Sequence, residues 1–167
     1  KHTPLGLLAV ERCADLIQRA IKFEQQNFLY IKALGSPWVQ FNGQTLNLSH
    51  RQIEILCILA LHPHGIGLEE LHYALYGERN VSIKTLKAEL SQLRSLLPHS
   101  IEARIYRLSC EVQCDFLRAE QSLNANLISS TFSLYKGSFL SKSDSPLLST
   151  WRHCFDARLS QLIYQIR

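Results

Sequence analysis

The stretch from Ile83 to Leu97 constrains the fold of this chain more than any other. Its apolar residues succeed one another at steps of three, four, three and four positions, which places them on one stripe of an α-helix. These residues are Ile83, Leu86, Leu90, Leu93 and Leu97. The opposite side is short, polar and positive, with Lys84, Lys87, Ala88, Ser91, Arg94 and Ser95. Such a helix can be an ordinary surface helix with a solvated charged face, or it can bury one side and lay the other in a DNA groove.

Two more helices are predicted upstream of this stretch. The first, from His50 to about His62, is strongly apolar, and it begins with Ser49 followed three residues later by Gln52, the pattern of a capping box. The second runs from about Leu68 to Tyr76 and ends at Gly77, because glycine commonly terminates helices. Three helices therefore follow one another closely.

Short strands are predicted on both sides of these helices. The predicted strands are Phe28–Leu34, Trp38–Phe41, Gln44–Leu48, Ile101–Arg104 and Ile105–Ser109. Asn42-Gly43 is a strong hairpin signal, since a type I′ turn needs two residues that accept positive φ. Strands, three helices and a hairpin form the order of a winged helix-turn-helix, so the sequence predicts an α+β fold with a small N-terminal sheet. In that fold Ile83–Leu97 enters the major groove, and the hairpin, or wing, lies beside it.

A long helix is predicted at the N-terminal end, reaching to about Asn27. Apolar residues at alternating spacings of four and three positions form a seam suited to a partner helix. The seam residues are Ala9, Cys13, Leu16, Ala20 and Phe23. This helix either packs on its own domain or is a dimerising or signalling helix that descends from an N-terminal sensor domain. The sequence leaves both alternatives open.

The residues of the central region resemble a known family. LNLSHRQIEILCILALHPHGIGLEELHYALYGE, Leu46–Glu78, is similar to the first two helices of OmpR/PhoB-type winged-helix domains. Thr85–Arg94 resembles the recognition helix of that family, and Tyr106–Leu108 resembles its wing-closing strand. The resemblance covers about residues 28–110. It implies a bacterial transcriptional regulator that binds double-stranded DNA sequence-specifically, as a homodimer, with RNA polymerase as a further partner.

Both flanks resemble segments found in such regulators. Tyr135–Leu159 is similar to the opening of the activator domain of SARP-type regulators, and Ser145-Pro146 is a suitable start for its helix. His2–Ile21 resembles the terminal helix of a GAF sensor domain. We therefore expect a linker or signalling helix at 1–27, a winged-helix DNA-binding domain at 28–110 and a helical extension at 111–167.

Composition and motifs argue against other classes of protein. Hydrophobic residues make up 46% of the chain and charged residues 19%, values that suit a folded domain. The net charge is +4, and five basic residues against two acidic ones lie between Val81 and Arg107. No apolar run is long enough to span a bilayer, so we expect a cytoplasmic protein without a membrane partner.

No arrangement typical of an enzyme or a metal site stands out. The seven histidines and five cysteines form no zinc-like array, and the seven glycines form no phosphate-binding loop. We therefore expect no catalytic residues, no metal and no cofactor. An odd number of scattered cysteines is typical of reduced, buried thiols in a cytosolic protein.

The residues expected to contact DNA come from three places. From the third helix they are Lys84, Thr85, Lys87, Ser91, Gln92 and Arg94. Arg104 lies near the tip of the wing, and Ser49 and Arg51 lie at the start of the first core helix, where a helix N-terminus favours a phosphate. The cations can reach phosphates or guanine edges, whereas the shorter polar side chains suit closer contacts.

Several departures from the family pattern predict weak binding to DNA. Two polar residues stand where the family commonly carries basic ones, Glu89 adds a negative charge, and the wing is short. Arg94 and Arg107 have an alternative role in salt bridges with Glu89 or Glu102. Because each phosphate contact contributes counterion release, a single copy should bind poorly and two copies reading two half-sites should bind better. The alternative is a protein-interaction adaptor that keeps the fold, does not bind DNA and uses its apolar C-terminal helix for a partner.

Overall fold

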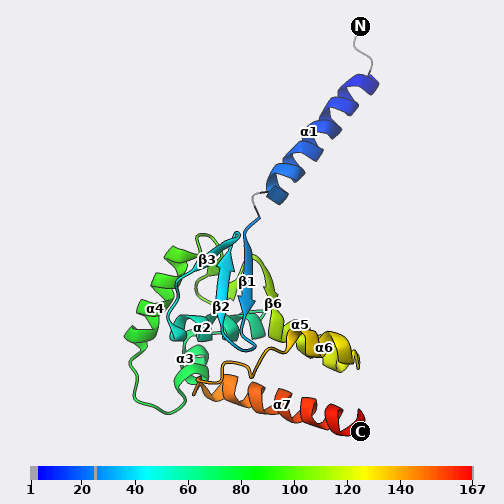
Figure 1. Cartoon of the computed structure of the whole chain (residues 1–167). Helices are drawn as coiled ribbons and strands as arrows, with labels where there is room; N and C mark the ends of the chain where they lie inside the picture. The colour runs from blue at the N-terminus through cyan, green and yellow to red at the C-terminus, as the bar shows by residue number, and fades with distance from the viewer. Residues whose placement is uncertain (1–3, 25, 167) are drawn as a thin grey trace.

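The structure, a computed structural model, describes residues 4–24 and 26–166, and the side chains of residues 6–21 and 26–166 (Figure 1). The helices are α1 (Pro4–Glu24), α2 (His50–Leu61), α3 (Leu68–Tyr76), α4 (Ile83–Leu96), α5 (Asp115–Asn124), α6 (Ile128–Leu134) and α7 (Pro146–Ile166). The strands are β1 (Phe28–Lys32), β2 (Trp38–Phe41), β3 (Gln44–Leu46), β4 (Ile101–Glu102), β5 (Arg107–Leu108) and β6 (Glu111–Cys114). The predicted α+β fold, with its N-terminal sheet, is confirmed.

The N-terminal sheet has the strand order β3-β2-β1-β6. β1, β2 and β3 are antiparallel neighbours. The predicted hairpin turn is confirmed, since Asn42 and Gly43 have φ angles of 51° and 82°. The Asn42 side chain also accepts a hydrogen bond from the Phe28 backbone N–H at 2.8 Å, which fixes the turn beside the start of β1.

The fourth strand, β6, was not predicted. It pairs in parallel with β1, from Phe28 opposite Glu111 to Ile31 opposite Cys114. Residues 111–114 therefore belong to the same sheet as β1, although the expected limit of the winged-helix segment lies at residue 110. A four-residue strand carries little local signal, and its partner is distant in the sequence, so this pairing arises only in the folded chain.

The core of the winged helix is built around α2, whose residues from Gln52 to Leu59 are buried. The predicted capping box is confirmed: the Ser49 hydroxyl accepts from the Gln52 N–H at 3.2 Å, and the Gln52 side chain accepts from the Ser49 N–H at 3.0 Å. α3 and α4 pack against α2 through fully buried leucines, among them Leu71, Leu75, Leu86 and Leu93.

The wing is shorter than the predicted strands. β4 and β5 pair over only two positions, because residues 103–106 form the turn. Tyr106 exchanges backbone hydrogen bonds of 3.0 and 2.9 Å with Ile66, in the loop between α2 and α3. In that loop Gly65 has a φ of 98°, and a Cβ there would lie 2.1 Å from Cγ2 of Ile105. The wing is thus fixed against the α2–α3 loop.

The C-terminal helices pack on the winged helix. Asp115, the first residue of α5, is buried and accepts backbone hydrogen bonds from Ala33 at 2.8 Å and Leu34 at 3.0 Å, beyond the end of β1. Burial raises the pKa of Asp115, while these backbone donors act in the opposite direction. α7 lies beside α3 and closes an aromatic cluster of Phe116, Phe139, Trp151 and Phe155. Leu148, Phe155 and Leu159 of α7 are buried.

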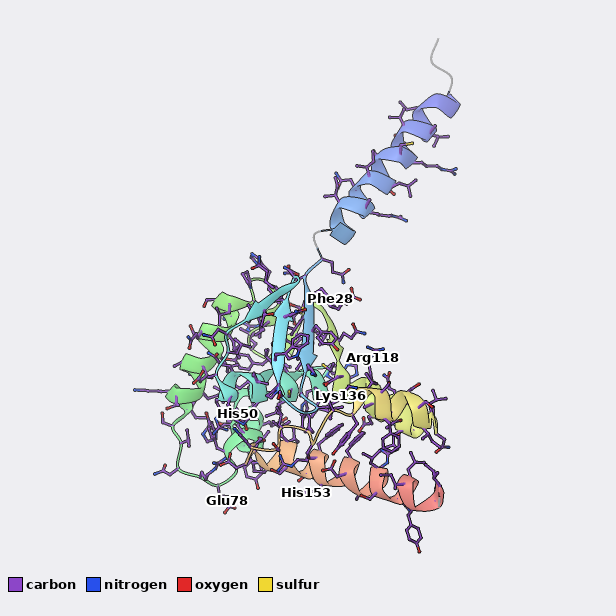
Figure 2. The ribbon with its side chains drawn as sticks, viewed as in Figure 1. Phe28, His50, Glu78, Arg118, Lys136 and His153 are labelled. Carbon is purple, nitrogen blue, oxygen red and sulfur yellow. The ribbon has the colours of Figure 1, made fainter. Side chains whose placement is uncertain are left out.

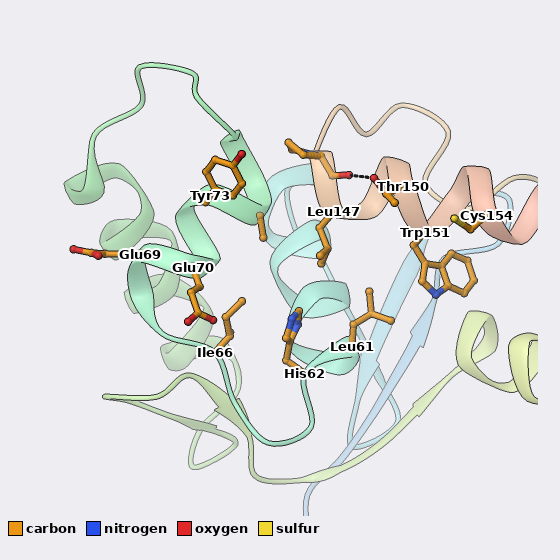
Figure 3. A pocket seen from close by; sticks show the side chains of 12 residues that line it. Leu61, His62, Ile66, Glu69, Glu70, Tyr73, Leu147, Thr150, Trp151 and Cys154 are labelled. Atoms are coloured by element: carbon orange, nitrogen blue, oxygen red, sulfur yellow. Dashed lines mark hydrogen bonds between the residues drawn. The ribbon is translucent and has the colours of Figure 1, made fainter.

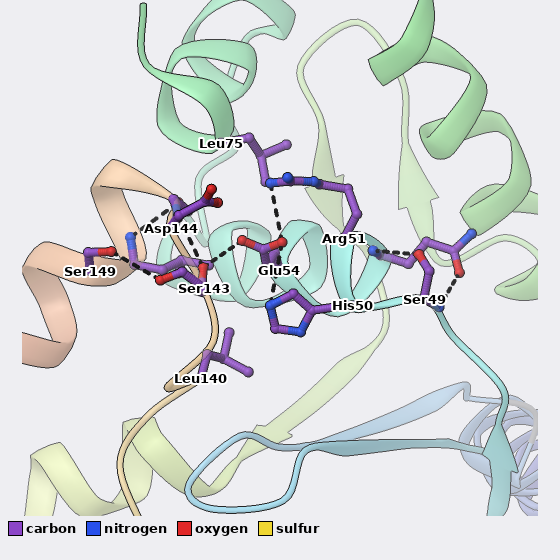
Figure 4. A network of polar contacts seen from close by, with 12 residues as sticks. Ser49, His50, Arg51, Glu54, Leu75, Leu140, Ser143, Asp144 and Ser149 are labelled. Carbon is purple, nitrogen blue, oxygen red and sulfur yellow. Dashed lines mark hydrogen bonds and ion pairs between the residues drawn. The ribbon is translucent and has the colours of Figure 1, made fainter. Parts of the chain in front are cut away.

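The segment that precedes α7 is tied to the winged helix by polar contacts (Figure 4). The Ser143 hydroxyl donates to the buried Glu54 carboxylate of α2 at 2.5 Å. The Ser145 hydroxyl donates to the Ala74 carbonyl of α3 at 2.6 Å and accepts from the Leu148 N–H at 3.3 Å, which confirms Ser145 as the N-cap of α7.

α1 differs from every other helix in its surroundings. It leads away from the sheet, and all of its described side chains, residues 6–21, are exposed (Figures 1 and 2). The expected seam is exposed at Ala9, Cys13, Leu16 and Ala20, while the side chain of Phe23 lies outside the described residues. Of the two alternatives for this helix, packing on its own domain is not observed for residues 6–21.

The cysteines are all free, but they are not all buried. Cys57 and Cys114 are buried, and burial raises the pKa of Cys114 to about 12. Cys110 is half-buried, whereas Cys13 and Cys154 are exposed on α1 and α7. The expectation of buried thiols is therefore wrong for the two exposed positions.

Candidate DNA-binding surface

α4 is held by its apolar side and by its N-terminal cap. Leu86, Leu90 and Leu93 are buried against the core. The Ser82 side chain accepts a hydrogen bond from the Thr85 N–H at 3.3 Å and caps the helix. This cap was overlooked in the sequence, although a serine directly before the first apolar residue of a helix is its usual signal. The opposite side of α4 is consequently presented to solvent in a fixed orientation.

The predicted contact residues of α4 are all exposed. They are Lys84, Thr85, Lys87, Ser91, Gln92 and Arg94. Lys84, Lys87, Ser91 and Arg94 are three, four and three residues apart, so they form one stripe about 15 Å long. Within the described residues none of the three cations of this stripe forms an ion pair, so the alternative salt bridge of Arg94 is not observed.

Glu89 does not lie on the exposed face of α4. It is half-buried, and its Oε2 atom is buried without a hydrogen-bond partner among the described residues. Burial raises the pKa of Tyr76, the Arg51 guanidinium opposes that shift, and the Glu89 carboxylate adds to it. Glu89 thus lies at the flank of the exposed stripe, with one carboxylate oxygen turned inward, and the expectation that its negative charge weakens DNA binding stays a prediction.

The wing carries one free cation and one paired cation among its described residues. Arg104 is exposed in the turn and has a φ of 86°, a left-handed conformation that is unfavourable for a residue with a side chain. Arg107 forms an ion pair with Glu102 across the wing at 2.7 Å, which raises the pKa of Arg107. The predicted alternative role of Arg107 is thus confirmed.

The two expected contacts at the start of α2 differ from each other. Ser49 is exposed, with its hydroxyl engaged in the cap. Arg51 is directed into the protein: its Nη1 lies 3.2 Å from the Glu54 carboxylate, and its guanidinium lies 4.8 Å from the centre of the Tyr76 ring. Buried atoms, an acidic neighbour and a cation–π contact give Arg51 a structural role instead of a free phosphate contact.

Three helices on one core, followed by a two-stranded hairpin fixed to the α2–α3 loop, define a winged-helix fold. No protein-family model matches the sequence. The solved structure of Mycobacterium tuberculosis EmbR in complex with a low-affinity phosphopeptide superposes with a TM-score of 0.62, over 82% of this chain and 44% of that chain, at 17% identity. An identity this low shows a shared fold.

A curated relative is similar in sequence. It is an uncharacterized 47.3 kDa protein in the thcA 5′ region of Rhodococcus erythropolis, 30% identical over 113 residues. The match covers 67% of this chain and 26% of that protein, so the chain spans about a quarter of the relative's length.

Residues 4–24 and 26–166 show neither a metal-binding cluster nor a membrane-spanning helix. This part of the chain holds no group of three or more His, Cys, Asp or Glu side chains able to bind a metal ion together. None of its helices combines the length and the apolar character needed to cross a membrane.

Proposed function

We propose that this chain is the DNA-binding output module of a bacterial transcriptional regulator of the OmpR/PhoB type. In this proposal α4 lies in the major groove and the wing lies along the neighbouring backbone. The observation that carries the proposal is the stripe of exposed, unpaired cations on α4, Lys84, Lys87 and Arg94, on a helix whose other side is buried. A helix anchored in this way can enter the groove without losing contacts to its own core.

The contacts are assigned by the chemistry of each side chain. Lys84, Lys87 and Arg94 meet phosphates or guanine edges, and Thr85, Ser91 and Gln92 make shorter contacts. Arg104, at the tip of the wing, meets the backbone or the minor groove. Ser49 marks the N-terminus of α2, where backbone N–H groups favour a phosphate. Arg51 positions α2 against α3 through Glu54 and Tyr76 and is left out of the contact set.

The proposed regulator acts as a homodimer in the cytoplasm and is not an enzyme. Three cations on the recognition helix give a modest affinity for DNA, since non-specific affinity rises with the number of phosphates neutralised. Two copies held together read two half-sites with a higher effective concentration. α1 is assigned as the signalling and dimerising helix below a GAF-type sensor, and Tyr135–Leu159 as the start of a SARP-type activator region. RNA polymerase is the further partner that an activator needs.

The direct test is DNA binding by a double variant of α4. Lys84→Ala together with Lys87→Ala should weaken binding to the upstream DNA of its own operon at least tenfold, measured by fluorescence anisotropy. The slope of log affinity against log salt concentration should fall by about 2, because each lost phosphate contact lowers it by about 1.

Lys136→Ala with Lys142→Ala is the matched control. Both lysines are exposed, and they lie in the segment between α6 and α7 instead of on α4. The control should keep the affinity and the salt slope of the unmodified chain. An unchanged salt slope in the α4 variant would show that α4 is not the DNA-contacting helix.

One observation favours a second function, a protein-interaction adaptor. An apolar groove lies between α3 and α7, on residues that the proposed DNA contacts do not use. If the chain shows no salt-dependent affinity for its operon DNA or for random DNA of the same length, the adaptor function is the better assignment.

A further inference from the structure

A groove of about 950 Å³ lies where α2, α3 and α7 meet (Figure 3). Its walls are mostly apolar, formed by Leu61, Ile66, Tyr73, Leu147 and Trp151. Tyr73 is 62% exposed, and the other four range from buried to half-buried. Exposed apolar surface that is gathered in one depression, and not scattered singly, marks a binding surface.

Two polar groups inside the groove are already engaged within the chain. His62 Nδ1 lies 2.7 Å from the Ile58 carbonyl oxygen, and the Thr150 hydroxyl donates to the Pro146 carbonyl at 2.9 Å. These groups have little need of a polar ligand. The groove therefore selects an occupant by apolar contact, with its aromatic side chains as the largest surfaces.

The shape of the walls favours a helix as the occupant. Besides Pro146, α7 lines the groove with four residues that lie three, one and three positions apart and so share one face over two turns: Leu147, Thr150, Trp151 and Cys154. Both long walls are helices, whose backbone groups are bonded internally, so an extended peptide would find no main-chain partners there. A third helix satisfies its own backbone and can pack between two others.

The rim of the groove is acidic. Glu69 and Glu70, in the first turn of α3, are exposed, and within the described residues neither forms an ion pair. Their charges favour the N-terminus of α3 itself. They also repel DNA and acidic peptides and attract cationic side chains that approach the groove.

We propose that the groove between α3 and α7 binds an amphipathic helix of a partner protein whose apolar face is flanked by lysine or arginine. The apolar side chains of that helix enter between Tyr73 and Trp151, and its cations meet Glu69 and Glu70. No residue lines both this groove and the α4 contact face, so the two proposed surfaces share no side chain. The inference stands whether or not α4 binds DNA.

Trp151 is a reporter inside the groove. The chain has two tryptophans, so Trp38→Phe leaves Trp151 as its only indole. We would titrate this variant with three synthetic helical peptides of roughly 18 residues, about five turns. They share leucines at helical spacing and differ in carrying lysine flanks, glutamate flanks or a scrambled order. The lysine-flanked peptide should shift the Trp151 emission and saturate at micromolar concentration, and the other two should bind at least tenfold more weakly.

Charge reversal on the rim tests the electrostatic part of the proposal. Glu69→Lys with Glu70→Lys should weaken the lysine-flanked peptide at least tenfold. Glu78→Lys, an exposed position outside the groove, is the matched control and should change the affinity less than twofold. Thermal unfolding of each variant shows that the fold is intact, and the salt slope for DNA, measured on the same samples, reports on α4 separately.

Three results would overturn the proposal. Equal binding of the glutamate-flanked or scrambled peptide would show a non-selective apolar surface. No response to any of the peptides would show that the groove takes no helix. The third result is a Trp151 emission that changes with protein concentration alone. If Leu16→Glu on α1 abolishes that change, α1 of a second copy occupies the groove, and the groove is a contact between copies of this chain.

Discussion

α1 and α7 are helices of equal length, 21 residues each, and their surroundings are opposite. α7 buries Leu148, Phe155 and Leu159, whereas α1 exposes every described side chain from residue 6 to residue 21. Both carry apolar residues at helical spacing. The comparison teaches that periodicity predicts a helix and an apolar face, but does not predict what covers that face.

The difference arises before α7 begins. The segment 139–145 brings α7 to the body through hydrogen bonds to α2 and α3, and Arg152 of α7 in turn donates to the Leu140 carbonyl at 2.6 Å and the Ser143 carbonyl at 3.2 Å. α1 has one ion pair among its described residues, between Arg19 and Asp15 at 3.5 Å, within the helix itself. α7 is thus part of the folded body, and α1 is available for another chain.

The largest expected effect comes from the buried aromatic face of α7. Phe155 is 2% exposed and stacks on Trp151 with ring centres 5.0 Å apart. Phe155→Ala should lower the free energy of unfolding by about 3–5 kcal/mol, because it removes a buried ring and leaves a cavity. Urea unfolding followed by circular dichroism measures the change.

Ile17→Ala on α1 is the matched control, since Ile17 is 59% exposed. It should change the free energy of unfolding by less than about 0.5 kcal/mol at low protein concentration. A comparable loss for both variants would contradict the contrast. A loss for Ile17→Ala that appears only at high protein concentration would show that a second copy covers α1, as the proposed homodimer requires.

The second largest effect on stability is expected at Arg152, whose guanidinium binds the segment before α7. Arg152→Ala should lower the free energy of unfolding by roughly 2 kcal/mol, because the carbonyls of Leu140 and Ser143 lose charge-assisted donors. Arg152→Lys should recover only part of the loss, since an ammonium cannot serve several acceptors in one plane. Arg19→Ala on exposed α1 should cost at most about 0.5 kcal/mol. Equal costs at positions 152 and 19 would remove the distinction between the two helices.

The smallest effect on the free energy of unfolding is expected from loss of the exposed ion pair between Asp144 and Arg79, whose charged atoms lie 2.5 Å apart. The hydrogen bond from Arg79 lowers the pKa of Asp144 below its ordinary value of 3.8. A lowered pKa means that the stabilisation is present above the ordinary value and is lost as the pH falls through the folded-state pKa. Asp144→Asn should therefore lower stability by less than about 1 kcal/mol at neutral pH, since the pair is exposed.

The difference between Asp144→Asn and the unmodified chain should shrink as the pH falls below 3.8 and disappear once it is below the lowered pKa of Asp144, in urea unfolding measured across pH. Asp15→Asn on α1 is the exposed control and should alter stability at neutral pH by no more than about 0.5 kcal/mol. If Asp144→Asn is still less stable than the unmodified chain in acid, the contact stabilises the fold through packing and not through charge.

Much of the candidate site could be predicted because its signals are local. The spacing of the leucines in α4 predicted which face is buried, and the exposed face followed for Lys84, Lys87 and Arg94. The inward orientation of the Glu89 and Arg51 side chains could not be predicted. Whether such a side chain points inward depends on a neighbour from another element. For Arg51 that neighbour is Tyr76 of α3.

The sequence by itself determined α1 to α4 and the start of α7, the Asn42-Gly43 turn, the caps at Ser49 and Ser145, and the cationic stripe of α4. These features depend on residues within a few positions of each other, where backbone sterics and hydrogen bonds act directly. The tertiary structure decided that β6 joins β1, that Asp115 meets Ala33 and that α7 is covered while α1 is exposed. Such contacts link residues far apart in the chain, and their free energy appears only when a whole core has formed around them.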